Sequence, residues 1–512
     1  MARTKKAQQP QTTAQQLGSL MKSARDIMRK DKGLNGDADR LPMLTWIMFL
    51  KFLDDLEQVR ETNATLQGKP FKPAIEPPYR WRDWAAKEGG ITGDELLAFV
   101  NNDEAVRPDG KRGPGLFAYL RSLQGENGGN RRDVVATVFR GVQNRMINGY
   151  LLRDVIDKVN GIHFNASEEI HVLSRFYESM LKEMRDASGD SGEFYTPRAV
   201  VRFMVAVINP RLGEIVLDPA CGTGGFLVEA FSHLEKQCKK VEDREALQSR
   251  SIYGGEAKPL PYLLAQMNLL LHGLEYPRID PGNSLRVPLR EIGDKERVDV
   301  VLTNPPFGGE EEKGIQGNFP EDKQTSETAL LFLQLIMRKL KRRPKPGRAA
   351  VVVPNGTLFG DGVCARIKEE LLKEFNLHTI VRLPNGVFAP YTGIPTNLLF
   401  FDRSGPTKEV WYYEQPLPEG RKNYTKTAPI QLEEFADCIA WWKKREENER
   451  AWKVPVEELL ANNCNLDRKN PRGREDITHL PPEKLAESIL EKEKRIADIV
   501  GRIQNLLANQ NA

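Results

Sequence analysis

Hydrophobic residues follow a helical spacing through the first third of this chain. They recur at every third or fourth position within 17–56, and again from about 94 to 157, which predicts amphipathic helices. Residues 62–95 between them are rich in Pro and Gly and predict a loop. We therefore expect 16–160 to form an N-terminal all-helical domain that serves packing and carries no catalytic residue.

The pattern changes between residues 200 and 402, where short apolar, β-branched runs alternate with helical segments. The runs that predict strands are 214–218, 251–255, 298–302, 349–353, 379–383 and 396–401. This alternation predicts an α/β domain with a doubly wound, mostly parallel sheet, which we assign to 161–403. Sheets of this kind bind ligands at the carboxyl ends of their strands.

The two ends of the chain differ from this core. Residues 1–15 are polar and are expected to form a disordered tail, and 404–480 reads as a loop-like C-terminal extension. Residues 481–512 predict a C-terminal amphipathic helix with one apolar stripe at near-heptad spacing. Such a helix either docks a partner helix or packs on its own domain.

Candidate chemistry begins where the strand at 298–302 ends, at Asn304-Pro305-Pro306-Phe307. The prolines stop the strand, so Asn304 should lie at its carboxyl end. The Asn304 side-chain oxygen and the stiff neighbouring carbonyls can accept both hydrogens of an exocyclic amino group. Phe307 offers a flat face to a base, where stacking contributes about 1–3 kcal/mol. The simpler alternative is an ordinary Asn-Pro turn.

A glycine-rich turn follows the strand at 214–218. It reads Asp218-Pro219-Ala220-Cys221-Gly222-Thr223-Gly224-Gly225 and leads into a helix over 226–235. A strand, a glycine turn and a helix let the backbone approach a nucleoside-like ligand closely. The turn is neither G-x-G-x-x-G nor a Walker A loop, so a nuclease or ATP-driven motor role lacks support.

Two further segments are candidates for the same ligand. Glu256 ends the strand at 251–255 and could accept both ribose hydroxyls, although a solvated carboxylate is the simpler reading. It lies 34 residues after Gly222, farther than the roughly 20 of a dinucleotide fold, which disfavours NAD. Thr196 as N-cap and Pro197 at the first helical position predict the start of a helix over 199–208, whose free amides could face a carboxylate.

Composition narrows the class of protein. The net charge of the 512 residues is only +4, so a protein that grips DNA would share the binding with a partner. The five cysteines form no CxxC pair, which argues against a zinc site or disulfides and fits a reducing cytosol. The most apolar window, 41–50, is too short to span a bilayer, and no signal peptide precedes it. We expect a cytoplasmic protein without a metal or a membrane segment.

Taken in order, GEFYTPR, DPACGTGGF, the acidic Glu256, NPPF and LPNGVF resemble the amino-methyltransferases of DNA. More closely, the chain resembles the modification (M) subunits of Type I restriction–modification systems, over about 15–510. The resemblance implies a class I methyltransferase fold with S-adenosylmethionine as methyl donor. It also implies base flipping and N6-adenine methylation of DNA as the activity.

The same resemblance implies roles for individual residues. Asn304, Pro305, Pro306 and Phe307 match the catalytic motif, and Phe307 and Phe388 match the aromatics that stack on the target base. The implied cofactor contacts are Glu193, Phe194, Tyr195, Thr196, Pro197, Asp218, Pro219, Gly222, Thr223, Gly224, Gly225, Glu256 and Asn283. The family often has Asp where this chain has Asn283, so either Asn283 or Asp280 is expected at the cofactor adenine. Phe388 and Tyr391 are expected to be exposed on the loop 384–393.

Motif order carries an expectation about partners. Only about 110 residues follow Phe401, and they contain no clear recognition domain. Sequence recognition is therefore expected from a separate specificity (S) subunit, contacted by the terminal helix, together with a second M subunit and a restriction/translocation (R) subunit. The alternatives keep the fold and change the acceptor to RNA adenine or a protein glutamine amide, or keep the fold without catalysis.

Overall fold

The computed structural model describes residues 14–87, 90–124, 131–162, 196–389, 392–425 and 427–472, and within the C-terminal segment 490, 492–497 and 499–501. The chain divides into two compact units, Met1–Arg468 and Lys469–Ala512. Most of the expected tail and a helix expected over 167–184 lie outside the described residues. None of the described helices is long and apolar enough to cross a membrane.

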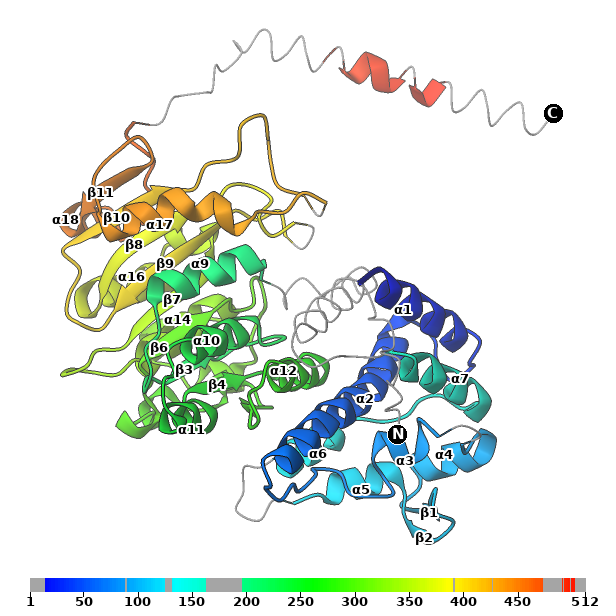
Figure 1. Cartoon of the computed structure of the whole chain (residues 1–512). Coiled ribbons are helices and arrows are strands. Elements are labelled where there is room, and N and C mark those ends of the chain that lie inside the picture. Colours follow the sequence, from blue (N-terminus) through cyan, green and yellow to red (C-terminus); the bar gives the residue numbers. More distant parts are fainter. Residues whose placement is uncertain are drawn as a thin grey trace, which may run out of the picture. The chain divides into compact units, whose positions relative to one another are not determined.

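The N-terminal part is helical as predicted (Figure 1, blue and cyan). Its helices are α1 (Ala14–Met28), α2 (Asp37–Leu66), α3 (Trp81–Trp84), α4 (Gly93–Asn101), α5 (Leu116–Ser122), α6 (Arg131–Arg140) and α7 (Gly149–Asn160). The expectation of an all-helical part was wrong in one place, where β1 (Glu104–Val106) pairs antiparallel with β2 (Arg112–Pro114). Strands of three residues are too short to show an alternating pattern.

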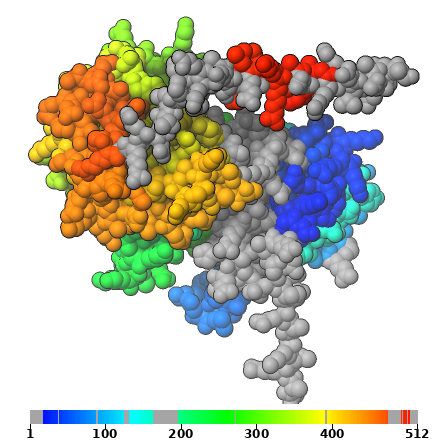
Figure 2. All heavy atoms as spheres, turned by 90° about the horizontal axis from the view of Figure 1, so that it is seen from above, coloured from blue at the N-terminus to red at the C-terminus, as the bar shows by residue number. Residues whose placement is uncertain are grey.

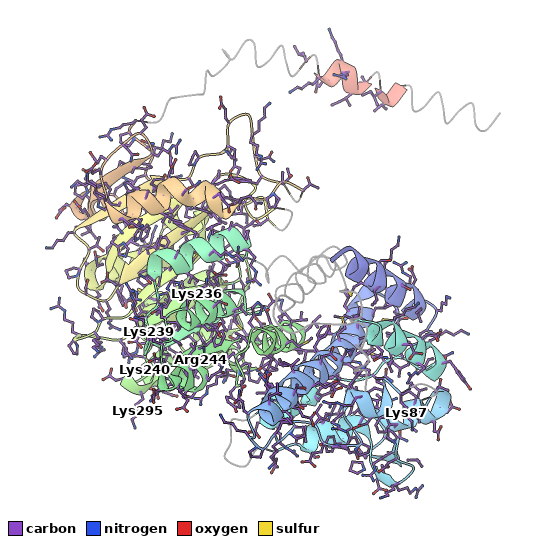
Figure 3. The ribbon with its side chains drawn as sticks, viewed as in Figure 1. Lys87, Lys236, Lys239, Lys240, Arg244 and Lys295 are labelled. Carbon is purple, nitrogen blue, oxygen red and sulfur yellow. The ribbon has the colours of Figure 1, made fainter. Side chains whose placement is uncertain are left out.

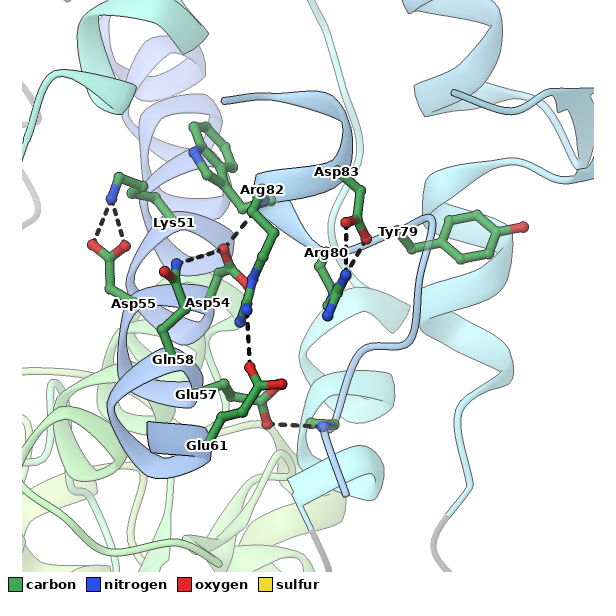
Figure 4. Close-up of polar contacts among 12 residues, drawn as sticks. Lys51, Asp54, Asp55, Glu57, Gln58, Glu61, Tyr79, Arg80, Arg82 and Asp83 are labelled. Atoms are coloured by element: carbon green, nitrogen blue, oxygen red, sulfur yellow. Dashed lines mark hydrogen bonds and ion pairs between the residues drawn. The ribbon is translucent and has the colours of Figure 1, made fainter. Parts of the chain in front are cut away.

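Hydrogen bonds and ion pairs to carboxylates of α2 hold the loop after this helix against it (Figure 4). The Asp54 carboxylate accepts a hydrogen bond from Arg82 at 2.9 Å, and Glu57 accepts the backbone N–H of Ala74 at 2.7 Å. Burial raises the pKa of Glu57, while its contact with Ala74 and the charge of Arg131 act in the opposite direction. The loop expected from its Pro and Gly content is thus held in place by charged side chains of α2.

The main sheet of the described residues has nine strands in the order β11-β10-β8-β9-β7-β6-β3-β4-β5. The strands are β3 (Val216–Asp218), β4 (Ile252–Gly255), β5 (Arg278–Asp280), β6 (Val300–Thr303), β7 (Arg348–Pro354), β8 (Asn376–Arg382), β9 (Thr396–Asp402), β10 (Glu409–Glu414) and β11 (Ala451–Pro455). β9 runs antiparallel to β7 and β8, and β11 runs antiparallel to β10, while the other neighbours are parallel. The predicted mostly parallel sheet is confirmed.

Helices cover both faces of this sheet, as the buried side chains show. Val300 and Leu302 pack in one core with α9 (Arg198–Ile208), α10 (Gly225–Glu235) and α17 (Ala436–Lys443). Val301 packs in the opposite core with α14 (Thr328–Lys339) and α16 (Val363–Glu374). Because both faces are buried, these strands read as continuous apolar runs rather than alternating ones. Further helices of this region are α11 (Val241–Arg250), α15 (Asn355–Phe359) and the short η2 (Ser284–Arg286), η3 (Leu289–Glu291) and η4 (Asp294–Glu296).

Helix α12 (Pro259–Leu271) is buried on two sides. Toward the sheet it contributes Tyr262, Ala265 and Leu269 to the core. Toward the N-terminal helices it contributes Leu263, Leu264, Met267 and Leu270 to their core. Arg60 of α2 also pairs with Glu275, just after α12, at 3.2 Å. α12 therefore packs against both the N-terminal helices and the sheet, which explains why it is apolar on nearly every side.

The interpretation of 404–480 as loop-like was wrong for 404–425 and 427–472, the part of this range that the structure describes. β10 and β11 extend the sheet, and η6 (Leu432–Phe435), α17 and α18 (Val456–Ala461) lie around them. Trp452 is buried and stacks on Tyr412, with ring centroids 5.2 Å apart. In Figure 2 the orange atoms of this region lie against yellow atoms of residues that precede them in the chain. Each element is short and separated by charged or Pro-containing loops, so no periodicity reveals it.

Residues 308–326 also carry more structure than their Gly- and Glu-rich sequence suggests. They contain α13 (Lys313–Gln316) and η5 (Glu321–Lys323), and Phe319 is buried against Leu285 and Phe332. In the second unit, 492–497 and 499–501 are helical as predicted. Leu490, Ile496, Ile499 and Val500 there are exposed.

Candidate active site

The strand order reverses next to β3. The chain passes from β3 to β4 and β5 on one side, and then returns to β6 and β7 on the other. Asp218 and Asp280 end β3 and β5, and Glu256 and Asn304 directly follow β4 and β6. These residues, predicted from four separate motifs, therefore lie at the carboxyl ends of four neighbouring strands. This switch point is where open α/β sheets bind ligands.

Asn304 is held by a residue that is distant in the sequence. Its Nδ2 donates a hydrogen bond to Oγ1 of Thr196 at 3.1 Å. Its Oδ1 is buried and has no hydrogen-bond partner among the described residues. A buried acceptor without a partner costs about 1–3 kcal/mol, so a donor from a ligand would be favourable there. The site thus presents one oriented amide oxygen.

The predicted N-cap role of Thr196 was wrong. The N-cap of α9 is Pro197, and no side chain caps the helix. A threonine hydroxyl before a helix commonly accepts a helix N–H. In the structure that hydroxyl instead accepts from Asn304, a contact that sequence spacing does not reveal. Glu193, Phe194 and Tyr195 of the same motif lie outside the described residues.

The aromatic pair beside Asn304 differs from expectation. Phe307 is half-buried, and its ring lies 6.4 Å from the ring of Phe388 at an angle of 63°. The prediction that Phe388 is exposed was wrong, because it is 4% exposed and packs with Leu383 and Val387 in the core. Tyr391 lies outside the described residues. Phe388 therefore supports Phe307 from within the protein.

The glycine turn takes a backbone conformation that favours glycine. Gly222 and Gly224 have φ angles of +53° and +79°, in the left-handed region. The N–H of Gly222 donates to Oε2 of Glu256 at 2.9 Å, and the N–H of Lys258 donates to Oε1 at 2.8 Å. A carboxylate oxygen can accept more than one hydrogen bond, so these two contacts are compatible with acceptance of ligand hydroxyls by Glu256.

Three side chains that sequence reasoning missed anchor the same turn. The bonds run from Arg198 to the Gly225 carbonyl at 3.2 Å, from Asn268 to the Thr223 carbonyl at 2.9 Å, and from Ser284 to the Pro219 carbonyl at 2.6 Å. Asn268 is almost fully buried within the apolar α12. A polar residue in such a helix is a usable signal, because burial requires it to find a partner.

Asp218 is the most perturbed acid of the site. Burial raises the pKa of its carboxyl to about 7, and the charge of Glu256 adds to the rise. The Thr303 hydroxyl and the N–H of Ala220 lower the pKa, but by less. Because this proton equilibrium lies near neutrality, a cationic ligand group beside Asp218 would favour the ionised carboxylate.

The two candidates for the cofactor adenine, Asn283 and Asp280, both have bonded side chains. Asn283 accepts the N–H of Leu285 at 2.9 Å and donates to Glu311 at 3.2 Å. Asp280 accepts the N–H of Gly282 at 2.9 Å and pairs with Arg286. These contacts shape the loop after β5, and the choice between Asn283 and Asp280 stays a prediction.

Comparison with known proteins adds to this geometry. Residues 168–479 match the family model for N-6 DNA Methylase, and residues 17–159 match the model for the HsdM N-terminal domain. The Type I restriction enzyme EcoEI methylase subunit of Escherichia coli is 50% identical over 501 residues, which cover 95% of this chain and 98% of that protein.

Two solved structures are similar to the whole fold. A modification subunit from Vibrio vulnificus YJ016 is 75% identical, covers 92% of this chain and all of that chain, and has a TM-score of 0.88. A chain from a structure of the type I R-M system is 42% identical, with coverage of 98% and 99% and a TM-score of 0.73. These matches favour DNA adenine over RNA adenine or a glutamine amide as acceptor. The chain belongs to the N-6 DNA methylase family, as a methylase subunit of the Type I restriction enzymes.

Proposed function

We propose that this chain transfers a methyl group from S-adenosylmethionine to N6 of an adenine that is turned out of duplex DNA. The observation that supports the proposal most strongly is the hydrogen bonding of the Asn304 side-chain amide. Its amide is oriented by Thr196, and its Oδ1 is buried without a partner among the described residues, at the switch point of the sheet.

The residues at the switch point fit the methyl donor, which supplies an electrophilic methyl group when bound. Glu256 can accept ribose hydroxyls, and the glycines of the turn, which have no side chains, let a ligand approach the backbone closely. Asp218 suits a cationic group. The amides at the start of α9 suit a carboxylate. The donor site proposed comprises Glu193, Phe194, Tyr195, Thr196, Pro197, Asp218, Pro219, Gly222, Thr223, Gly224, Gly225, Glu256 and Asn283.

The acceptor amine is held by the corner after β6. Asn304 Oδ1 and the backbone carbonyl of Pro305 accept the two N6 hydrogens, while Pro306 keeps the backbone stiff. Phe307, supported by Phe388, stacks on the flipped base. Two acceptors on one amino group orient its lone pair and make the nitrogen more electron-rich. No general base has to act before the attack, so positioning and electrostatics supply the rate.

Recognition of the DNA sequence is assigned to a separate specificity subunit in the cytoplasm, with a second modification subunit and a restriction subunit in the full assembly. The amphipathic C-terminal segment supports this assignment, because Leu490, Ile496, Ile499 and Val500 are exposed. Apolar residues at this spacing suit the groove of a partner helix.

The experiment measures methyl incorporation from labelled S-adenosylmethionine with the specificity partner present, on DNA, RNA and protein in parallel. We expect label in N6-methyladenine of DNA alone. Asn304→Ala should lower kcat at least 100-fold, the order seen when one transition-state contact is removed. The control is Asn376→Ala, at the amino end of β8 on the opposite edge of the sheet. Label in RNA or protein, or a rate for Asn304→Ala within tenfold of wild type, would refute the proposal.

A further inference from the structure

A cavity of about 470 Å³ lies where the N-terminal helices meet the sheet. On the helical side, Pro42 and Met43 of α2 and Val142 just after α6 line it. On the sheet side, Ala257 and Pro281 line it, from the loops after β4 and β5. Its volume is within the usual range of small-molecule sites, roughly 300–1,000 Å³.

Two residues of the cavity lining are chain neighbours of acidic residues at the switch point. Ala257 follows Glu256 in the chain, and Pro281 follows Asp280. One pose has the ribose on Glu256 and the base directed toward Ala257 and Pro281. Both are small apolar residues that line the cavity. An apolar lining with a few polar groups is typical of sites that bind such rings.

Polar groups for the edge of a base also come from the helical part. Thr137 of α6 and Gln143 line the cavity. The Thr137 hydroxyl donates to the carbonyl of Asp133 at 2.8 Å, which leaves its oxygen able to accept. In contrast, the side chains of Asn283 and Asp280 already make hydrogen bonds or ion pairs within the protein.

From this geometry we propose that the N-terminal helical part forms one wall of the donor site and binds the adenine end of S-adenosylmethionine through Met43, Val142 and Gln143. The inference rests on the proposed function and extends it to residues outside the methyltransferase motifs. A donor held by both parts is then expected to stabilise the packing of α6 against its neighbour α12. By reciprocity, any change in that packing alters donor affinity by the same factor.

The test uses the full chain and two variants that fill the cavity. Gln143→Trp places a large side chain there from an exposed position, and Val142→Trp does so from a buried one. The control is Lys239→Ala. Lys239 lies with Lys236, Lys240 and Arg244 around the end of α10 and start of α11 (Figure 3). Because α10 begins at the carboxyl edge of the sheet and runs back, this group lies at the opposite edge.

Calorimetry with S-adenosylmethionine alone should give a Kd at least tenfold higher for Gln143→Trp and unchanged for Lys239→Ala. Donor should also slow hydrogen exchange in α6 of the wild-type chain. Wild-type binding is the check on the proposed function, and its failure would overturn both proposals. If the wild type binds but folded Gln143→Trp binds within twofold of it, or exchange in α6 does not change, only the present inference is overturned.

Discussion

The side chain of Asn304 donates to the hydroxyl of Thr196 at 3.1 Å, across 108 residues of sequence. This bond joins the end of β6 to the start of α9. It fixes the orientation of the Asn304 amide. Because Nδ2 is bonded to Thr196, Oδ1 is the atom that faces the site. Thr196 is therefore a positioning residue for the acceptor.

Thr196→Val should lower kcat by about tenfold, since it removes one hydrogen bond worth roughly 1 kcal/mol and frees the amide to rotate. Thr196→Ser keeps the hydroxyl and should retain most of the rate. Steady-state methylation measures kcat, and calorimetry with S-adenosylmethionine measures the donor Kd. Together they separate a loss of acceptor positioning from a loss of donor binding. Thr196→Val changes only the side chain, so a positioning role of the hydroxyl lowers kcat with Kd within twofold, even though Thr196 belongs to the proposed donor site. A tenfold rise in Kd at unchanged kcat would show instead that the hydroxyl itself binds the donor.

Gly224→Ala tests the glycine turn against a matched glycine. Gly224 and Gly213 have φ angles of +79° and +87°, and a Cβ on Gly213 meets no atom within 4 Å. Both substitutions should cost about 1–2 kcal/mol of folding free energy from backbone strain. Only Gly224→Ala should also weaken S-adenosylmethionine binding, by calorimetry. Equal binding by the two variants would contradict a role for the turn in the donor site.

Asp218 should give the protein a pH dependence of known sign. Folding raises the pKa of this carboxyl from 3.8 to about 7, so the folded state binds more protons than the unfolded state between these values. Its contribution to stability therefore falls as pH rises through this window and is constant above about 7. In denaturant titrations, Asp218→Asn should gain stability relative to wild type by up to about 4 kcal/mol between pH 4 and pH 7.5. A difference that does not change with pH would rule this out.

α12 allows a comparison of its two faces. Leu264 packs in the N-terminal helical core and Leu269 packs in the sheet core, and both are fully or nearly fully buried. Each Leu→Ala change should cost about 2–5 kcal/mol. Because one helix serves both cores, calorimetric scans should show one unfolding transition shifted by either variant. Two separate transitions, each moved by one variant only, would contradict a shared core.

The strands of the catalytic region could be predicted because two buried faces give unmistakable apolar runs, as in Val300–Thr303 and Arg348–Pro354. The clustering of the motif residues that end these strands could be predicted as well, because parallel strands place their carboxyl ends at the same edge of the sheet. The bond between Thr196 and Asn304, and the anchoring of the turn by Asn268, could not be predicted, because they depend on tertiary contacts without local periodicity. Phe388 was placed wrongly because its flanking Gly and Pro residues resemble an exposed loop.

The late strands have a practical consequence for anyone who shortens this protein. A fragment that stops at residue 403 would contain every methyltransferase motif, yet it would lack β10, the hydrogen-bonding neighbour of β8. The exposed backbone groups of β8 would then invite pairing with other molecules, and Tyr412 would no longer shield that side. Such a fragment should precipitate, although its sequence contains the complete chemistry.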